Sequence, residues 1–267
     1  MFFFAENFPG IWTTFNQVFK YSEKEEQKQE AETYMNLAQQ HLSHLSNCRG
    51  LGEESVSSSL KCSYNTISSP FLRLAPLKLE QLSLDPQIVL YHDVIYKQEI
   101  ADILRLTKPY FRRALVGSDV ARSDVRRGSM RVGLAQNASL SIERLNRRLK
   151  DMSGFELSFN KELEVINYGI GGQYYMHYKC RFELNKQAYL ENNNRIATVL
   201  LYLTDVQLGG FTSFPLLNMG VQPKKGAALM WHNVNNAAES DKRMLHAACP
   251  VLQGNRWVAA QWFEMTK

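Results

Sequence analysis

The sequence predicts a mainly β domain with flanking helices, of the sandwich or jelly-roll type. After Glu162 almost every segment alternates or runs apolar over a short stretch, and clusters of Gly, Asn and Pro separate these stretches. Strand and helix do not alternate there, as they would in a parallel α/β sheet. The expected strands read LEVINYG, QYYMHYKCRF, RIATVLLYLT, GFTSFP, AALMWHNV and RWVAAQWFEM.

Two helices upstream of these strands are expected to cover the sheet. The first spans 97–108 and ends before Pro109, and a strand reading IVLYHDV precedes it. The second spans 141–152, with Ser139 or Ser141 as its N-cap and Gly154 as its stop. Its apolar residues recur at spacings of three and four: Ile142, Leu145, Leu149 and Met152.

The N-terminal part of the chain has a different character. Residues 22–46 are rich in Glu, Gln, Lys, Ala and Leu without Gly or Pro, which predicts one helix. Its apolar stripe is narrow (Tyr34, Leu37, Leu42 and Leu45), so we expect it to pack on another segment or chain. We therefore divide the chain into a helical segment at 1–46, a Gly- and Ser-rich linker at 47–82 and a main domain at 83–267.

Composition excludes several classes of protein. The chain has 267 residues, of which 45% are hydrophobic, and a net charge of +5, which is typical of a globular protein. The pairs Arg112–Arg113, Arg126–Arg127 and Arg147–Arg148 are interpreted as a solvated face, and we expect no nucleic-acid partner. No apolar run approaches the length of a membrane span, and the first residues lack the pattern of a signal peptide.

The four cysteines are too few for a disulfide scaffold and form no CxxC metal motif. Cys48 and Cys62 flank a Ser-rich stretch and are our disulfide candidates, with two unpaired thiols as the alternative. Closing such a loop stabilises a fold by roughly 3 kcal/mol in the chain-entropy model. Asn137 begins the glycosylation sequon Asn-Ala-Ser, which matters only in a secretory compartment.

Ordered sequence blocks resemble the catalytic domain of collagen prolyl 4-hydroxylase alpha subunits. The blocks are NYGIGGQYYMH at 167–177, NRIATVLLYL at 194–203, GGFTSFP at 209–215, PKKGA at 223–227 and HAACPVLQGNRW at 246–257. The resemblance covers the chain from Ser83 to its end and implies a double-stranded β-helix. Residues 1–46 are then interpreted as the remnant of an upstream domain.

The resemblance also implies a reaction, that of a procollagen-proline 4-dioxygenase. Family members hydroxylate proline in collagen-like Xaa-Pro-Gly sequences with Fe(II), 2-oxoglutarate, oxygen and L-ascorbate, and hydroxyproline stabilises the collagen triple helix. By resemblance we expect a collagen-like proline-rich peptide as substrate and a protein disulfide isomerase-type beta subunit as partner. The implied location is the lumen of the endoplasmic reticulum.

The family's iron motif departs from its usual form in this chain. The resemblance assigns His177 and His246 as imidazole ligands, but the family's His-X-Asp reads His177-Tyr178-Lys179. Residues i and i+2 of a strand face the same side, so Lys179 stands in the position of the carboxylate. An ammonium group has no acceptor, and deprotonating it at pH 7 costs roughly 4–5 kcal/mol. We therefore expect weak or absent iron binding.

Two other side chains near the motif are weaker candidates for the missing ligand. Glu183 would face the same side of a strand as His177 but lies roughly 20 Å further along a continuous strand, and Cys180 would face the opposite side.

The sequence thus leaves two functions open. One is a dioxygenase of weakened or lost activity, and the other is a non-catalytic homologue that binds a peptide or a subunit.

The remaining site residues also come from the resemblance. Arg256 stands where the collagen enzymes have the lysine that pairs with the distal carboxylate of 2-oxoglutarate, and arginine binds a carboxylate bidentately. Thr198 and Tyr168 lie on strands expected to line the same pocket. Cys249 matches a family cysteine whose partner lies near a longer C-terminus, so no partner for it is expected within this chain.

Overall fold

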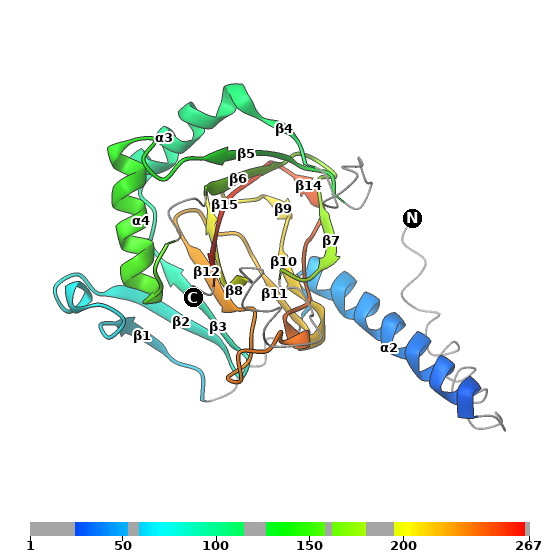
Figure 1. Ribbon diagram of the computed structural model, residues 1–267. Coiled ribbons are helices and arrows are strands. Elements are labelled where there is room, and N and C mark those ends of the chain that lie inside the picture. Colours follow the sequence, from blue (N-terminus) through cyan, green and yellow to red (C-terminus); the bar gives the residue numbers. More distant parts are fainter. Residues whose placement is uncertain (1–24, 53–58, 115–126, 158–161, 180–194, 265–267) are drawn as a thin grey trace.

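The computed structural model describes residues 25–52, 59–114, 127–157, 162–179 and 195–264, and its strands form two main antiparallel sheets (Figure 1). The larger sheet has nine strands in the order β1-β2-β3-β12-β8-β15-β6-β5-β4. In that order the strands are Cys62–Asn65, Leu77–Leu84, Gln87–His92, Ala228–His232, Arg195–Tyr202, Arg256–Glu264, Leu163–Tyr168, Met130–Leu134 and Arg112–Arg113.

The smaller sheet has four strands in the order β11-β10-β13-β7. These strands are Met219–Val221, Thr212–Phe214, His246–Ala248 and Tyr174–His177, and a separate pair joins β14 (Val251–Gln253) to β9 (Leu208–Gly209). Phe214 and Ala248 of the smaller sheet share an apolar cluster with Tyr202 and Trp231 of the larger one. This two-sheet arrangement confirms the predicted double-stranded β-helix.

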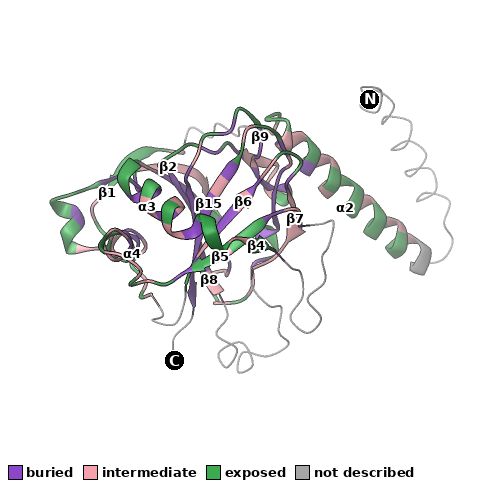
Figure 2. Ribbon diagram, turned by 90° about the horizontal axis from the view of Figure 1, so that it is seen from above, coloured by how far each residue is buried: buried purple, intermediate pink, exposed green. Residues whose placement is uncertain are grey.

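The central strands of the larger sheet are apolar along their whole length because both of their faces are covered. In β8, Val199 and Leu201 belong to the cluster that packs under the helices, whereas Leu200 and Tyr202 belong to the cluster between the sheets. Alternate residues of one strand thus point to opposite cores. Figure 2 shows these buried strands beneath the exposed outer surfaces of the helices.

Helices α3 (Lys97–Thr107) and α4 (Leu140–Ser153) cover the outer face of the larger sheet, as expected, and lie close to the predicted ranges. The Ser139 side chain caps α4 by accepting from Ile142 N, and Gly154 ends it with φ of +72°. Arg148 of α4 donates to both carboxylate oxygens of Glu99 of α3, which joins the two helices. Asn137 is exposed in the turn before α4.

Helix α2 (Glu25–Cys48) leads away from the body of the domain, and only its last turns contact it (Figure 1). Ser43 Oγ donates to Pro215 O over 2.7 Å, and Asn47 Nδ2 donates to Ser213 Oγ over 3.1 Å. A Cβ on Gly220 of β11 would lie 2.6 Å from Asn47 O, so the helix end packs directly on that backbone. Most of the apolar stripe remains exposed: Tyr34, Leu37 and Leu45.

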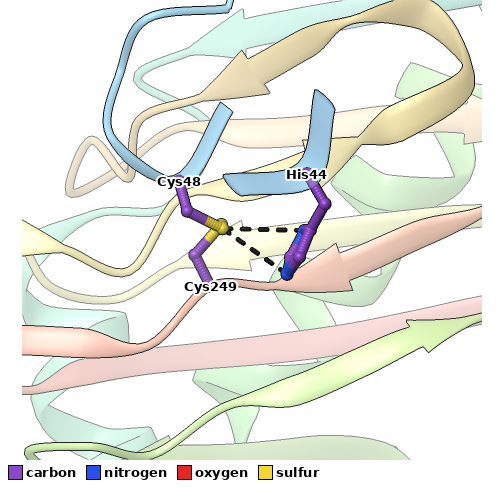
Figure 3. A group of neighbouring side chains, drawn as sticks. All are labelled: His44, Cys48 and Cys249. Carbon is purple, nitrogen blue, oxygen red and sulfur yellow. Dashed lines mark hydrogen bonds between the residues drawn. A yellow bond between two sulfur atoms is a disulfide. The ribbon is translucent and has the colours of Figure 1, made fainter. Parts of the chain in front are cut away.

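The predicted disulfide between Cys48 and Cys62 is wrong. Cys48 is bonded to Cys249, with a Cα–Cα separation of 5.4 Å (Figure 3), and Cys62 is an exposed free thiol. Cys48 ends α2 against the smaller sheet, where Cys249 follows β13, whereas Cys62 opens β1 at one edge of the larger sheet. A disulfide requires Cα atoms within about 7 Å, so contact in the fold and not proximity in sequence selects the partner.

The residues of the expected linker contribute to the larger sheet. Within 47–82, β1 pairs with β2, and β2 pairs with β3, so the sheet begins well before Ser83. A short 3-10 helix, η1 (Pro70–Arg73), connects β1 to β2, and the Ser69 side chain caps it. None of the described helices is both long enough and apolar enough to span a membrane.

Candidate functional site

A cavity of about 40 Å³ lies between the two sheets and brings together the residues that the sequence singled out. The site residues that line it come from five strands or their ends, and they are Tyr168, His177, Lys179, Thr198, His246 and Arg256. A volume of this size holds only a few water molecules. A larger ligand therefore enters only when side chains at the cavity wall move.

His177 and His246 lie opposite each other as paired residues of β7 and β13, with ring centroids 4.5 Å apart. Nδ1 of His177 lies 2.7 Å from Tyr175 O, and Nδ1 of His246 lies 2.8 Å from Met244 O. These contacts place a proton on each Nδ1 and leave the lone pair on each Nε2. Both Nε2 atoms are buried and have no hydrogen-bond partner among the described residues.

Both imidazoles are neutral in this environment. Burial is the main cause that lowers the pKa of His246, to about 3, and that holds the pKa of His177 well below its usual value. The charge of Lys179 lowers both further. Two neutral imidazoles with unpartnered Nε2 atoms on one side of a buried cavity match two of the three ligands of a non-haem iron site.

Lys179 lies where the third ligand would be expected. Its Nζ is 5.1 Å from the ring centroids of both Tyr174 and Trp262, which is a cation–π arrangement. Burial lowers the pKa of Lys179 to about 7, and Glu164 opposes that shift. The described lining of the cavity includes no Asp or Glu. With a pKa of about 7, Lys179 is only partly protonated at neutral pH, and neither of its forms is negatively charged. The residues present therefore fit Fe(II) incompletely, with two imidazoles and a lysine amine in place of two imidazoles and a carboxylate.

Glu164 is the carboxylate that acts on Lys179, and it is already engaged. Arg127 Nη2 lies 3.1 Å from Glu164 Oε1, and Arg131 Nη1 lies 3.5 Å from the same atom. The two alternative ligands that the sequence offered, Cys180 and Glu183, lie outside the described residues. The described part of the site thus contains no carboxylate that is free to replace the family's aspartate.

Two arginines near the cavity were not identified from the sequence. Arg127 places its guanidinium carbon 4.5 Å from the Tyr174 ring centroid, and Arg195 places its own 4.0 Å from the Trp262 ring centroid. The interpretation of Arg127 as part of a solvated face is wrong, because only 7% of it is exposed. The residues next to Arg127 in the sequence do not indicate that its side chain is buried. Basic side chains therefore outnumber acidic ones around the cavity, although Glu164 pairs with Arg127.

Arg256 begins β15 and is 1% exposed. Its Nη2 donates to Thr212 Oγ1 over 2.8 Å, and its guanidinium carbon lies 5.0 Å from the Tyr168 ring centroid. No ion pair joins Arg256 to an acidic side chain in the described part of the chain, and its Nε has no hydrogen-bond partner there. A buried cation without a counterion is costly, so this position suits an anionic ligand.

Neutral hydroxyl groups surround the guanidinium of Arg256. Tyr202 Oη lies 2.7 Å from Thr212 Oγ1, and burial raises the pKa of Tyr168 and of Tyr202, so both phenols stay neutral. Thr198 lines the cavity, but its hydroxyl exchanges hydrogen bonds with Asn233, at 3.0 and 3.3 Å. The residue that contacts Arg256 is Thr212 and not Thr198, and Thr212 was not predicted. The position of Thr212 within the GFTSFP segment gives no local signal of this contact.

Comparison with protein families and curated proteins agrees with this geometry. Residues 163–264 match the model of the 2OG-Fe(II) oxygenase superfamily. Prolyl 4-hydroxylase subunit alpha-3 of Bos taurus is 37% identical over 222 residues, which are 80% of this chain and 41% of that protein. Prolyl 4-hydroxylase subunit alpha-1 of Homo sapiens is 38% identical over 227 residues, which are 80% and 42% of the two chains. The chain thus spans about two fifths of the length of these relatives.

A solved structure shares the fold. The viral collagen prolyl hydroxylase of Paramecium Bursaria Chlorella virus-1, in complex with 2OG, superposes with a TM-score of 0.56 and 19% sequence identity. The match covers 67% of this chain and 96% of that one. At 19% identity this similarity establishes that the two proteins share the jelly-roll fold.

Proposed function

The chain is a homologue of the prolyl 4-hydroxylase alpha subunits and belongs with them to the 2OG-Fe(II) oxygenase superfamily, and from this premise we propose that its Fe(II)-dependent hydroxylation is impaired. The single observation behind this proposal is the chemistry of the cavity wall. Two imidazole Nε2 atoms face it beside the amino group of Lys179, and no carboxylate lines its described part.

His177 and His246 would hold the iron. The site bonds both Nδ1 protons to backbone carbonyls, so the rings are already oriented and need no tautomer change to bind a metal. When bound, Fe(II) supplies the oxidative chemistry of this superfamily together with 2-oxoglutarate. Lys179 opposes iron binding because it replaces a negatively charged ligand, and because its protonated form adds a positive charge within the same low-dielectric cavity.

Arg256 would bind the distal carboxylate of 2-oxoglutarate. Its guanidinium is buried, lacks an acidic partner among the described residues, and is held by Thr212 beside the ring of Tyr168. A carboxylate that accepts two hydrogen bonds from it would neutralise its charge. Arg256 can bind the co-substrate even though the third iron ligand is missing, because its contact with the distal carboxylate does not involve the metal.

The substrate and surroundings follow from the relatives. We propose a collagen-like proline-rich peptide as ligand, L-ascorbate as the reductant of any residual activity, and a protein disulfide isomerase-type beta subunit as partner. The proposed location is the lumen of the endoplasmic reticulum. The Cys48–Cys249 disulfide supports an oxidising compartment, and the exposed position of Asn137 is compatible with glycosylation there.

A non-catalytic homologue that binds a peptide or a subunit is the second candidate. The absence of a carboxylate from the described lining of the cavity favours it. The two candidates share the pocket and the anion site at Arg256, and they differ only in turnover.

Iron binding and turnover of the purified wild-type protein test the proposal. The protein is titrated anaerobically with Fe(II), and decarboxylation of 2-oxoglutarate is then measured with and without a Pro-Pro-Gly repeat peptide. We expect substoichiometric iron at concentrations that saturate a two-histidine, one-carboxylate site, and little or no peptide-dependent turnover. Stoichiometric iron with peptide-coupled turnover would show that the site is competent despite Lys179.

A further inference from the structure

A second group of metal-ligating side chains lies where the end of α2 meets the smaller sheet. Figure 3 shows His44 and Cys48 on the helix, with Cys249 opposite. Cys48 Sγ lies 3.6 Å from His44 Nδ1 and 3.7 Å from His44 Nε2. One ligand atom from each of the three residues falls within 4.8 Å of the others. None of these residues lines the cavity that contains His177 and His246.

We propose that His44, Cys48 and Cys249 bind a divalent zinc-type cation when the Cys48–Cys249 disulfide is reduced. This site is independent of the proposed hydroxylase chemistry. Two thiolates and one imidazole form a soft ligand set of the kind that selects Zn²⁺, and the fourth tetrahedral position is left to water.

The distance between Cys48 and His44 suits tetrahedral coordination, and the two sulfurs have to move apart once their bond is reduced. With Zn–S bonds of about 2.3 Å and Zn–N bonds of about 2.05 Å, a tetrahedral angle places sulfur and nitrogen about 3.6 Å apart. Cys48 Sγ is nearly equidistant from the two nitrogens of the His44 ring, at 3.6 and 3.7 Å, so the sulfur lies at the required distance and the ring has to turn to direct one nitrogen lone pair at the cation. The same bonds place the two sulfurs about 3.8 Å apart, which side-chain rotation can reach from Cα atoms 5.4 Å apart.

The scaffold holds the three ligands independently of the disulfide. His44 and Cys48 are four residues apart on α2 and therefore lie on the same side of the helix. Cys249 is fixed by its backbone, because its N–H donates to Phe211 O over 2.9 Å. Asn47, between the two helix ligands, is bonded to Ser213. His44 is 5% exposed and Cys249 is fully buried, so water competes weakly for the ligands.

Reduction of the Cys48–Cys249 disulfide balances in electrons and protons when a dithiol is the reductant. A dithiol transfers two electrons to the Cys48–Cys249 bond and is itself oxidised to a disulfide, which leaves two protein thiols. Each thiol releases its proton to solvent as it binds the cation, so two protons leave for each Zn²⁺ bound. The oxidised protein has no thiolate to offer, and disulfide and metal exclude each other.

The cluster contacts both strands that hold the site histidines. Cys249 follows β13, which begins with His246, and the ring of Tyr175, two residues before His177, lies 6.1 Å from the His44 ring. His41 Nδ1 lies 3.0 Å from Tyr175 Oη. A bound cation would therefore keep α2 attached behind the site under reducing conditions, as the disulfide does under oxidising ones.

The test uses Co²⁺ as a spectroscopic substitute for Zn²⁺. The full chain is prepared with Cys62→Ser and Cys180→Ser, so that Cys48 and Cys249 are its only cysteines, and oxidised and reduced samples are titrated in parallel. We expect the reduced protein to bind one Co²⁺ with thiolate charge-transfer absorption, and Zn²⁺ to displace it. The oxidised protein should show no such band, since imidazoles in the cavity cannot produce it.

His44→Ala should weaken the binding of Co²⁺ by the reduced protein more than tenfold, because it removes a direct ligand. His92→Ala is the matched control and should leave the titration unchanged, since His92 pairs with Glu80 elsewhere on the surface. If reduction alone loosens the fold, Zn²⁺ should restore the wild-type circular dichroism and raise the melting temperature of the reduced sample only. Absence of the thiolate band, or equal affinities for wild type and His44→Ala, would overturn the proposal.

Discussion

Lys179 holds its Nζ atom 5.1 Å from the ring centroid of Trp262, on the wall of the cavity that His177 and His246 also line. The rings of Trp262 and Tyr174 both lie beside this amino group, and their attraction for its protonated form offsets only part of the cost of burial, because the pKa of Lys179 is still lowered to about 7. The contact explains how the fold tolerates a lysine beside two buried histidines. It also shows which single change should restore a metal site.

Lys179→Asp should raise the affinity for Fe(II) by more than about 100-fold and increase decarboxylation of 2-oxoglutarate. The expected gain in affinity is this large because loss of a residue that only hydrogen-bonds to a metal ligand already weakens metal binding by about 10–100-fold. Restoring a direct ligand should have a larger effect. Anaerobic iron titration and a decarboxylation assay measure both effects. Lys179→Leu, which removes the charge but adds no ligand, is the matched control and should recover much less. Equal gains from Asp and Leu would show that charge alone, and not the missing ligand, limits iron binding.

Arg256→Ala should weaken 2-oxoglutarate binding by about 10–100-fold, since a hydrogen bond to a charged group contributes about 1.5–3 kcal/mol. Isothermal calorimetry without iron measures this directly, and Arg256→Lys should retain part of the affinity because it keeps the charge and loses the bidentate geometry. Thr212→Val removes the acceptor of the Arg256 hydrogen bond and should have a smaller effect. Unchanged affinity in Arg256→Ala would mean that the guanidinium is only structural.

Cys48→Ser should lower the free energy of unfolding of the oxidised protein by about 2–5 kcal/mol, because the disulfide closes a loop between residues 201 positions apart. Denaturant unfolding measures the loss, and Cys62→Ser, at an exposed free thiol, should have little effect. Non-reducing peptide mapping should recover Cys48 joined to Cys249. A peptide that joins Cys48 to Cys62 would contradict the observed pairing.

Asp241 should make stability depend on pH in the acid range. The side-chain hydrogen bond from Arg243 is the main cause that lowers the pKa of Asp241 below its usual 3.8, despite the opposing effect of burial. A carboxyl whose pKa is lower when folded stabilises the protein fully above its unfolded pKa, and this contribution is lost as the pH falls through the folded pKa. Asp241→Asn should therefore cost about 1 kcal/mol near pH 7, since Arg243 is partly exposed, and progressively less below pH 3.8.

Thermal unfolding of wild type and Asp241→Asn across this pH range measures that difference. A gap between the two melting temperatures that stays constant down to the lowest pH would exclude the ion pair as its cause. Because Asp241 begins the turn η4 (Lys242–Met244), whose Met244 carbonyl accepts from His246, the variant also tests how firmly that histidine is held.

Local patterns in the sequence determined the helices and the strands, and the resemblance to a known family supplied the candidate site residues. Ser139 and Gly154 mark the ends of α4 because capping depends only on residues within one turn. The strand segments after Glu162 follow from short alternating or continuously apolar runs between clusters of Gly, Asn and Pro, and the ordered blocks pointed to His177, His246, Lys179 and Arg256 as candidate site residues. The sequence also showed that a lysine stands where the resemblance implies a carboxylate, because that substitution is a matter of residue type at one position.

Only the tertiary structure decided which distant residues meet. Cys249 and not Cys62 is the partner of Cys48, Arg127 is buried beside Tyr174, and Thr212 holds Arg256. Each of these contacts joins residues from different strands, loops or helices, so no spacing along the chain encodes it. The physical reason is that such contacts depend on how the two sheets and α2 pack, which is determined by burial over the whole domain and not by any short segment.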